Sequence, residues 1–598
     1  MPKKKTAVNY TSRDFNSIKA ELVDYAKRYY PDTFRDFNEA SFGALMLDTV
    51  AYVGDMLSFY LDYQANESFL STAIEYDNVI KLIKQTGFRL DLSPTATGTV
   101  TFYIIVPASA TANEPDTAYM PVLEKGTELS TVDGRNFVLN QDIDFANVQT
   151  GDVVPARQDP TTGLPTYFAL KARGPVISGD LLVDEIEVGA FEKFRKVGLR
   201  GQNITEILSV VDSNGNEYYE VDYLTQDVIY KSIKNRNEDK DVVGSVLSAI
   251  SVPRRYVVEK DRTGVNLLFG FGSDSELTTQ SVVDPSNVVL KVYGKDYYST
   301  TTLDPSRLLQ TDKLGVGPAN TTLTVKYRVN SAANMNTGVG ALSIVKGPLA
   351  RFSSINTLNT ALVSETVNSL EVTNEEQIVG SVSYPSTEEL RKRALSTFAT
   401  QSRAVTKQDY IAMAYNMPAQ FGAIKRCNIL QDKDSLKRNL NLYVLSEDNN
   451  GKFILANNTL KRNLKTWLTS VKMINDTIDI LDPVIVNLGI NFRAVIEYSA
   501  NRFEIMNDVT DALETYFETK PNMAQPFFLS DIYNVINDVS GIVDAEDVVV
   551  YQRTGLNYAS AAVAVSDYTS PDGRVIQFPE NTIWEVKYPK SDIRGVLR

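Results

Sequence analysis

The strongest pattern of apolar positions lies between Ser41 and Gln64, where fifteen of twenty-four residues are apolar and only three are charged. The charges, Asp48, Asp55 and Asp62, recur every seven residues, so on a helix they form one narrow acidic row. Apolar residues at the same spacing lie opposite this row and beside it, in the arrangement of a heptad seam. The pattern predicts a helix about 36 Å long that is apolar on two faces.

Nine large side chains make up these apolar rows and are the predicted contacts with other chains: Phe42, Leu45, Met46, Val50, Tyr52, Val53, Leu57, Phe59 and Tyr60. Ser71 is the expected N-cap of a second helix, and Gly87 is its expected C-terminal stop. Because the sequence turns to a β pattern after Leu92, we expect no nearby helix of this chain to cover these two, and helices of other chains to complete a bundle. The alternative is the core helix of an ordinary domain, since about three heptads is the shortest run that supports a coiled coil.

The remaining patterns predict an α+β multidomain protein. From Gly98 the apolar period changes to two, with Val100, Phe102, Ile104 and Val106 on one face of a half-buried strand. Helical and strand patterns alternate toward the C-terminus, which is typical of helices packed on an antiparallel sheet. The predicted parts are an N-terminal helical segment for the partner bundle (1–95), a β-rich domain (96–199), a second β-rich domain (200–350), an α/β domain (351–450) and a C-terminal α+β domain (451–598).

Composition and charge exclude several classes of function. The formal net charge is −14, and the segment from Asp36 to Ile80 holds eight acids and no Lys or Arg, which disfavours nucleic acid or an anionic membrane as a partner. Histidine is absent, so serine triads, cysteine–histidine dyads and histidine-based zinc sites are excluded. Cys427 is the only cysteine, which fits a reducing cytoplasm. We expect neither a secretory signal nor a transmembrane helix, because the uncharged stretch 93–113 contains prolines and many threonines and serines.

Carboxylate chemistry is the catalytic class that stays open. A glycan hydrolase would use Glu185 and Glu187, or Asp212 and Glu217, yet each pair lies in a predicted exposed strand or turn. The segment around Asp212 superficially resembles a calcium loop, but Glu217 stands where that loop needs glycine, and Asn214-Gly215 predicts a β-hairpin. We therefore expect a structural protein rather than an enzyme, with no catalytic residue, cofactor or metal.

Three groups of short motifs occur in order along most of the chain. They are YTSRDF (10–15) with NEASFGALMLD (38–48) and IKQTGFR (83–89); VLEKGTELS (122–130) with DGRNF (133–137); and STEELRKR (386–393) with RAVTKQDY (403–410). In their order and spacing they resemble the baseplate J-like family of contractile-tailed bacteriophages, and within it the baseplate wedge subunit of T-even-like myophages. The third group is the most diagnostic.

The resemblance implies a late structural protein of the virion tail baseplate, assembled in the host cytoplasm. Such subunits are paired copies whose N-terminal helices share a bundle with a helix of a neighbouring wedge protein. Their C-terminal domains, here including helices predicted at 503–518 and 529–539, meet those of adjacent wedges. The contacts close an inner ring around the tail tube that relays the trigger for sheath contraction. The implied partners are thus a second copy, other wedge proteins and adjacent wedges, with no nucleic acid and no membrane.

Overall fold

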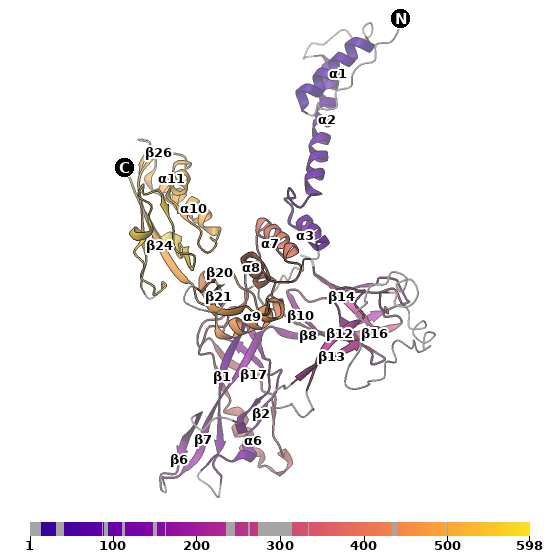
Figure 1. Ribbon diagram of the computed structural model, residues 1–598, viewed down its shortest axis with the longest axis vertical. Coiled ribbons are helices and arrows are strands. Elements are labelled where there is room, and N and C mark those ends of the chain that lie inside the picture. The colour runs from indigo at the N-terminus through magenta and orange to yellow at the C-terminus, as the bar shows by residue number, and fades with distance from the viewer. Residues whose placement is uncertain are drawn as a thin grey trace. The chain divides into compact units, whose positions relative to one another are not determined.

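The structure is a computed structural model that describes residues 14–30, 41–86, 88, 94–109, 114–147, 152–161, 163–234, 245–260, 264–272, 314–332, 334–432, 439–498, 500–555 and 557–598. The chain divides into two compact units, Met1–Leu90 with Pro385–Phe398, and Asp91–Tyr384 with Ala399–Arg598. The first unit is helical, and the second carries β-sheets followed by mixed helices and strands (Figure 1). The predicted α+β multidomain class is therefore confirmed.

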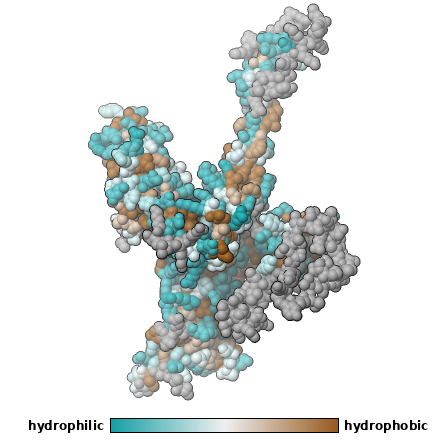
Figure 2. All heavy atoms as spheres, viewed as in Figure 1, coloured by the Kyte–Doolittle hydropathy of each residue, from teal (hydrophilic) through white to brown (hydrophobic). Residues whose placement is uncertain are grey.

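Helix α2 (Phe42–Glu67) is the predicted apolar helix, and α1 (Phe15–Tyr29) lies along its first half (Figure 1). The helix begins at Phe42 because the Ser41 hydroxyl accepts the N–H of Ala44 at 3.1 Å. The two helices approach closely at Gly54, where an added Cβ would lie 3.3 Å from the side chain of Ile18. Figure 2 shows apolar residues gathered along the exposed length of α2.

The second predicted helix is α3 (Tyr76–Gln85), and the structure corrects two expectations about it. Ser71 is not its N-cap: the helix starts at Tyr76, because the preceding turn is held by the Glu67 carboxylate, which accepts the N–H of Ile74 at 2.8 Å. The helix is also covered from within the chain. Helix α7 (Thr387–Thr400) packs on it although the two lie far apart in sequence.

The contact between α3 and α7 is a small closed core. Leu390 and Ala394 of α7 pack with Val79 and Ile83 of α3, and all four are buried. The guanidinium of Arg391 donates to the backbone carbonyl of Ala73 at 2.6 Å, which fixes the turn that leads into α3. Gly87, the expected C-terminal stop of this helix, lies outside the described residues. Of the two N-terminal apolar helices, only α2 thus keeps large apolar side chains in solvent.

The first sheet of the second unit has the strand order β17-β3-β4-β7-β1-β19, with β6 also paired to β7. Strand β1 confirms the predicted alternation, because Val100, Phe102, Ile104 and Val106 are all buried. Short strands β2, β5 and β18 form a separate small sheet, and α6 contacts β1. The bounds are β1 (Thr97–Pro107), β2 (Val122–Leu123), β3 (Glu128–Thr131), β4 (Asn136–Leu139), β5 (Ile143–Asp144), β6 (Val153–Gln158), β7 (Pro165–Ser178), β17 (Leu342–Gly347), β18 (Ala350–Arg351), α6 (Thr360–Asn368) and β19 (Glu371–Thr373).

The second sheet has the order β8-β16-β10-β11-β14-β15-β9, and strands β12 and β13 form a separate ribbon. The predicted hairpin is confirmed, since Val210 pairs with Tyr218 across the Asn214-Gly215 turn. Strands β17 and β19 of the first sheet follow this second sheet in sequence, so the limits of the sheets do not coincide with boundaries at residues 199 and 350. The bounds are β8 (Asp180–Val188), β9 (Lys196–Gly198), β10 (Ile204–Asp212), β11 (Glu217–Glu220), β12 (Val228–Lys234), β13 (Ser245–Ser251), β14 (Arg255–Lys260), β15 (Val265–Phe269) and β16 (Thr321–Val329).

A four-stranded sheet follows, in the order β20-β21-β22 with β23 parallel to β21, and it packs against α8 and α9. Helix α8 begins with a capping box, in which Thr406 accepts the N–H of Asp409 and the Asp409 carboxylate accepts the N–H of Thr406. The sheet takes β22, α9 and β23 from beyond residue 450, so its limit does not coincide with the boundary predicted there. The bounds are α8 (Lys407–Tyr415), β20 (Arg426–Gln431), β21 (Asn439–Glu447), β22 (Phe453–Leu455), α9 (Asn458–Val471) and β23 (Thr477–Leu481).

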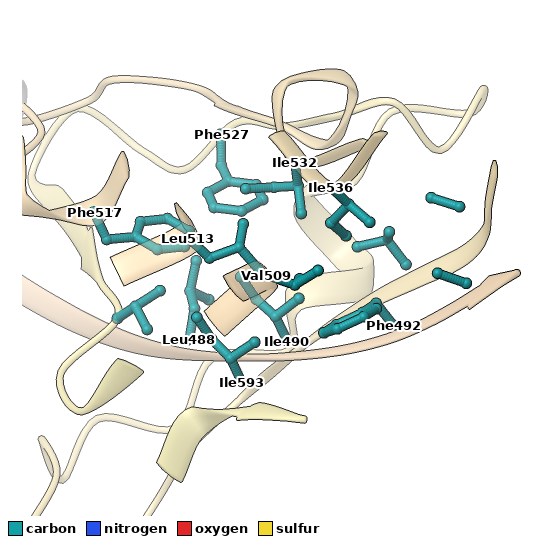
Figure 3. Packing of buried hydrophobic residues seen from close by; sticks show 14 of the residues in the cluster. Leu488, Ile490, Phe492, Val509, Leu513, Phe517, Phe527, Ile532, Ile536 and Ile593 are labelled. Carbon is teal, nitrogen blue, oxygen red and sulfur yellow. The ribbon is translucent and has the colours of Figure 1, made fainter. Parts of the chain in front are cut away.

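The C-terminal part packs two helices against one face of a sheet, as predicted. Figure 3 shows Val509 and Leu513 of one helix and Ile532 of the other gathered over Leu488 and Ile490 of the central strand. The expectation of an antiparallel sheet is wrong, however. Strand β26 is antiparallel to β24, whereas β28 pairs with the first part of β24 (Val484–Asn487) and β29 with a later part (Ile490–Ala494), both in parallel. The bounds are β24 (Val484–Ile496), α10 (Arg502–Glu518), α11 (Leu529–Asn537), β26 (Ile542–Gln552), β28 (Thr582–Glu585), α12 (Pro589–Asp592) and β29 (Ile593–Leu597).

A buried joint connects the β20–β23 sheet to the C-terminal part. The guanidinium of Arg426, 6% exposed, donates to the backbone carbonyls of Lys520 and Pro521, both at 3.0 Å. The ammonium of Lys520 lies 3.0 Å from the carboxylate of Glu585, which is 2% exposed and also accepts the N–H of Phe453 at 3.3 Å. An apolar cluster fills the remainder of the joint: Leu445, Phe453, Ile485, Met523 and Ile583. Buried paired charges and a shared apolar cluster thus join these two parts.

The core between α3 and α7 predicts the effect of truncating Leu390. Leu390→Ala leaves a cavity under α3 and should lower the free energy of unfolding of the helical unit by about 2–5 kcal/mol. Hydrogen exchange of the α3 amides measures this loss. Leu395→Ala on the same helix is the control, because Leu395 is 53% exposed and should change protection by about 0.5 kcal/mol or less. Equal effects of the two changes would contradict the packing.

The buried joint predicts a large effect for Arg426→Ala. The variant leaves the carbonyls of Lys520 and Pro521 buried without a donor, at a cost of roughly 1–3 kcal/mol each. Denaturant unfolding should show a lower free energy of unfolding. Limited proteolysis should release the C-terminal part earlier than in the parent. Arg493→Ala removes an exposed ion pair with Asp547 and should change stability little. Cleavage between the two parts that is no faster than in the parent would refute this role of the joint.

Candidate functional site: a helical protein interface

Helix α2 separates small and large side chains onto different faces. Ala44 and Ala51 are buried, and Ser58 follows them at the same seven-residue spacing. Gly54 adjoins this row and receives Ile18 of α1. Sequence analysis missed this use of the helix, although a row of small residues at heptad spacing is a readable signal for close helix packing. The face with little side-chain bulk is therefore the one that the chain itself covers.

The large side chains of α2 are exposed. All nine predicted contact residues have exposed fractions between 49% for Val53 and 75% for Phe42. Met56 and Leu61, which sequence analysis did not select, are exposed as well. At 100° per residue these positions span an arc of roughly 200°, about twice the apolar stripe of an ordinary surface helix. We call this set the apolar arc: Phe42, Leu45, Met46, Val50, Tyr52, Val53, Met56, Leu57, Phe59, Tyr60 and Leu61.

The acidic row runs along one border of the apolar arc. Asp48 forms an ion pair with Lys19 of α1, with Nζ and Oδ1 2.7 Å apart. Asp55 and Asp62 continue the row toward the C-terminal half of the helix. Because the sequence has no Lys or Arg between Asp36 and Ile80, α2 itself supplies no counter-charge for this row.

The turn after α2 is organised by the Glu67 carboxylate. It accepts the N–H groups of Ile74 and Glu75 and the side-chain amide of Asn78, the last at 3.0 Å. The hydrogen bond from Asn78, together with that from the backbone of Ile74, lowers the pKa of Glu67 below its ordinary value of 4.5. A charged Glu67 thus fixes the direction in which the chain leaves α2.

By length and composition α2 is also able to cross a membrane, with a mean hydropathy of 1.2 in its most apolar window and 11% of that window buried. This differs from the sequence expectation of no such helix, which weighed only residues 93–113. The acidic row argues against a lipid environment, since each carboxylate in the hydrocarbon core costs roughly 2.5–3.5 kcal/mol. A partner that is apolar along one side and polar along another fits α2 better.

The acid pairs considered for hydrolysis have structural surroundings. Glu185 and Glu187 are exposed on β8, which pairs with β16. The carboxylate of Asp212 accepts the N–H groups of Asn214 and Asn216, both at 2.9 Å, and so holds the hairpin turn. Glu217 accepts the hydroxyl of Tyr219 at 2.8 Å. In the part of the chain that the structure describes, no three Cys, Asp or Glu side chains are grouped to hold a metal ion.

A polar hollow of about 640 Å³ lies between β1, β7 and the start of α9. Of its lining residues, Glu375 forms an ion pair with Arg173 at 3.1 Å and a second one with Lys171 at 2.7 Å. Asn458 donates to Glu376 at 2.8 Å, and the hydroxyls of Thr99 and Thr459 are 3.0 Å apart. These mutual contacts explain the polar lining as the packing of α9 on the first sheet.

Comparisons with known proteins bear on the helical unit. Residues 14–85 match the family described as bacteriophage baseplate protein, N-terminal domain. The match supports a structural role in a phage baseplate and a location in the tail baseplate of the virion. A search of curated proteins gave no match.

Two baseplate assemblies are among the solved structures to which the chain is similar. For the baseplate of the anti-feeding prophage, symmetrised six-fold, the identity is 9% and the TM-score 0.25, over 97% of this chain and 99% of that chain. For the TssK-TssF-TssG baseplate subcomplex of the type VI secretion system, the identity is 10% and the TM-score 0.27, over 73% of this chain and 95% of that chain.

The lowered pKa of Glu67 predicts a pH dependence of the turn after α2. A carboxyl whose pKa is depressed by folding contributes stability above its ordinary pKa and loses it as the pH falls through the folded value. Amide protection at Ile74 and Glu75, corrected for intrinsic exchange rates, should hold near neutral pH and decline below about pH 4.5. Glu67→Gln should lower the protection and abolish its pH dependence, whereas Glu75→Gln should keep it. A parent profile that stays flat to low pH would contradict the assignment.

Proposed function

We propose that this chain, which carries a baseplate N-terminal domain at residues 14–85, is a wedge subunit that joins other baseplate proteins through the apolar arc of α2. The observation that supports this proposal is the apolar arc. Eleven large apolar side chains are exposed on one helix, and the small-residue face of that helix is already covered by α1. Exposed apolar surface this continuous marks a protein interaction site.

The width of the arc sets the number of neighbours. A helix in a two-stranded coiled coil uses a narrow seam, whereas the apolar arc spans roughly 200°. Two further helices are therefore needed to cover it. Completing the burial of a half-exposed apolar side chain contributes about 1 kcal/mol, so the full arc supplies on the order of 10 kcal/mol before association costs.

The assembly that fits these requirements is a bundle of two copies of α2 and one helix of a neighbouring wedge protein. It follows from the resemblance to baseplate J-like wedge subunits. In the same proposal, the C-terminal domains with α10 and α11 meet those of adjacent wedges and close an inner ring around the tail tube. Rigid parts suit the relay of a contraction trigger, because a displacement at one end of a stiff body reaches the other end undiminished.

Charge placed within the arc should abolish assembly without unfolding the chain. The double variant Val53→Asp/Leu57→Asp puts two carboxylates where partner helices would pack, so the particle mass measured with wedge proteins should fall to that of the unassembled chain. Circular dichroism should remain that of the parent, because both positions are exposed in the chain by itself.

The matched control is Val132→Asp/Val339→Asp, two exposed valines outside α2. This variant should assemble as the parent does. Normal assembly of the Val53/Leu57 variant, or equal loss in both variants, would exclude α2 as the assembly surface.

A further inference from the structure

We propose that the two halves of the apolar arc take different partners: the seam formed by Met46, Val50, Val53, Leu57 and Tyr60 takes α2 of a second copy, and the row formed by Leu45, Tyr52 and Phe59 takes a basic helix of another protein. The inference rests on the proposed function and adds the chemistry of the second partner. It follows from where the acidic row lies relative to each half.

The seam lies far from the acidic row. At 100° per residue, Val53 and Asp55 project 160° apart around the helix axis, and Met46 and Asp48 do the same. Two copies of α2 that pair through the seam therefore keep their acidic rows on the outside of the pair. No like charges meet in this arrangement.

The row of Leu45, Tyr52 and Phe59 lies beside the acidic row. Tyr52 precedes Asp55 by three residues and Phe59 precedes Asp62 by three, so each ring projects about 60° from a carboxylate. A helix packed on Tyr52 and Phe59 is therefore within reach of Asp55 and Asp62. Its side chains along that border must be compatible with a line of negative charge.

A second copy of α2 fails this requirement. The sequence contains no Lys or Arg from Asp36 to Ile80, so two such faces would bring acidic rows together. Like charges at close spacing destabilise helix pairs. A helix with Lys or Arg every seven residues instead forms ion pairs along the border, as Lys19 of α1 does with Asp48 at 2.7 Å.

The same charge pattern selects a protein helix over other apolar surfaces. An anionic lipid surface presents phosphate to the acidic row and is repelled by it. The occupant is therefore an amphipathic helix of about three heptads, apolar along its centre and basic along one flank.

Two synthetic helices serve as probes against the full chain. Both are three-heptad amphipathic peptides with leucine seams, and they differ only in carrying Lys or Glu at every flanking position. In fluorescence anisotropy the Lys peptide should bind at least tenfold more tightly than the Glu peptide. The difference should shrink as salt rises, because exposed ion pairs are screened. The variant Asp55→Lys/Asp62→Lys should reverse the preference.

Variants of the two halves separate this inference from the proposed function. Tyr52→Ser/Phe59→Ser should lose the Lys peptide and keep the mass of a two-copy species in sedimentation, whereas Val53→Asp/Leu57→Asp should lose the two-copy species. The assignment of a basic helix would be overturned if the two peptides bound equally or if neither bound. It would also be overturned if the charge variant did not reverse the preference, or if the chain preferred phosphatidylglycerol vesicles. Loss of the two-copy species in Val53→Asp/Leu57→Asp would still support the proposed function, and its persistence would refute that function instead.

Discussion

The architecture of the helical unit depends on the difference in apolar surface between two faces of one helix. Helix α2 has a narrow face of small residues, which α1 covers at Gly54, and a broad face of large apolar residues, which stays in solvent. Covering the small face releases little free energy, because Ala, Gly and Ser bury little surface. Covering the large face requires helices that this chain does not place there among its described residues. The unit is thus stable enough to position α2 and leaves most of the favourable burial for assembly.

Distant segments close the cores that the N-terminal helices cannot close alone. Helix α7 reaches back to cover α3, and Arg391 fixes the preceding turn through the carbonyl of Ala73. The same principle recurs in the second unit, where β17 and β19 complete a sheet begun by β1. Contacts between residues far apart in sequence make each of these cores dependent on the folding of the whole chain.

Carboxylates have structural roles throughout the described chain. Glu67 holds the turn after α2, Asp212 holds a hairpin, and Glu585 anchors the joint to the C-terminal part. Glu447, which is nearly fully buried, pairs with Lys425 at 2.8 Å. In each case the negative charge is balanced by N–H donors or an ammonium group, which is how a protein accommodates buried charge at moderate cost. These acids thus stabilise turns and joints of the fold.

The local sequence pattern was sufficient to predict several elements, because periodicity and turn chemistry act within a few residues. These elements are α2, the alternating strand β1, the Asn214-Gly215 hairpin and the C-terminal helices α10 and α11. The same reasoning identified all nine exposed candidates on α2, because an excess of apolar residues is visible without knowing the fold. Long-range packing decided the rest. Helix α7 covered α3, and the parallel pairing of β28 and β29 with β24 made the last sheet mixed rather than antiparallel. Nothing in the neighbouring residues encodes those outcomes, because they depend on which distant segment buries the most surface and satisfies the most polar groups once the whole chain has folded.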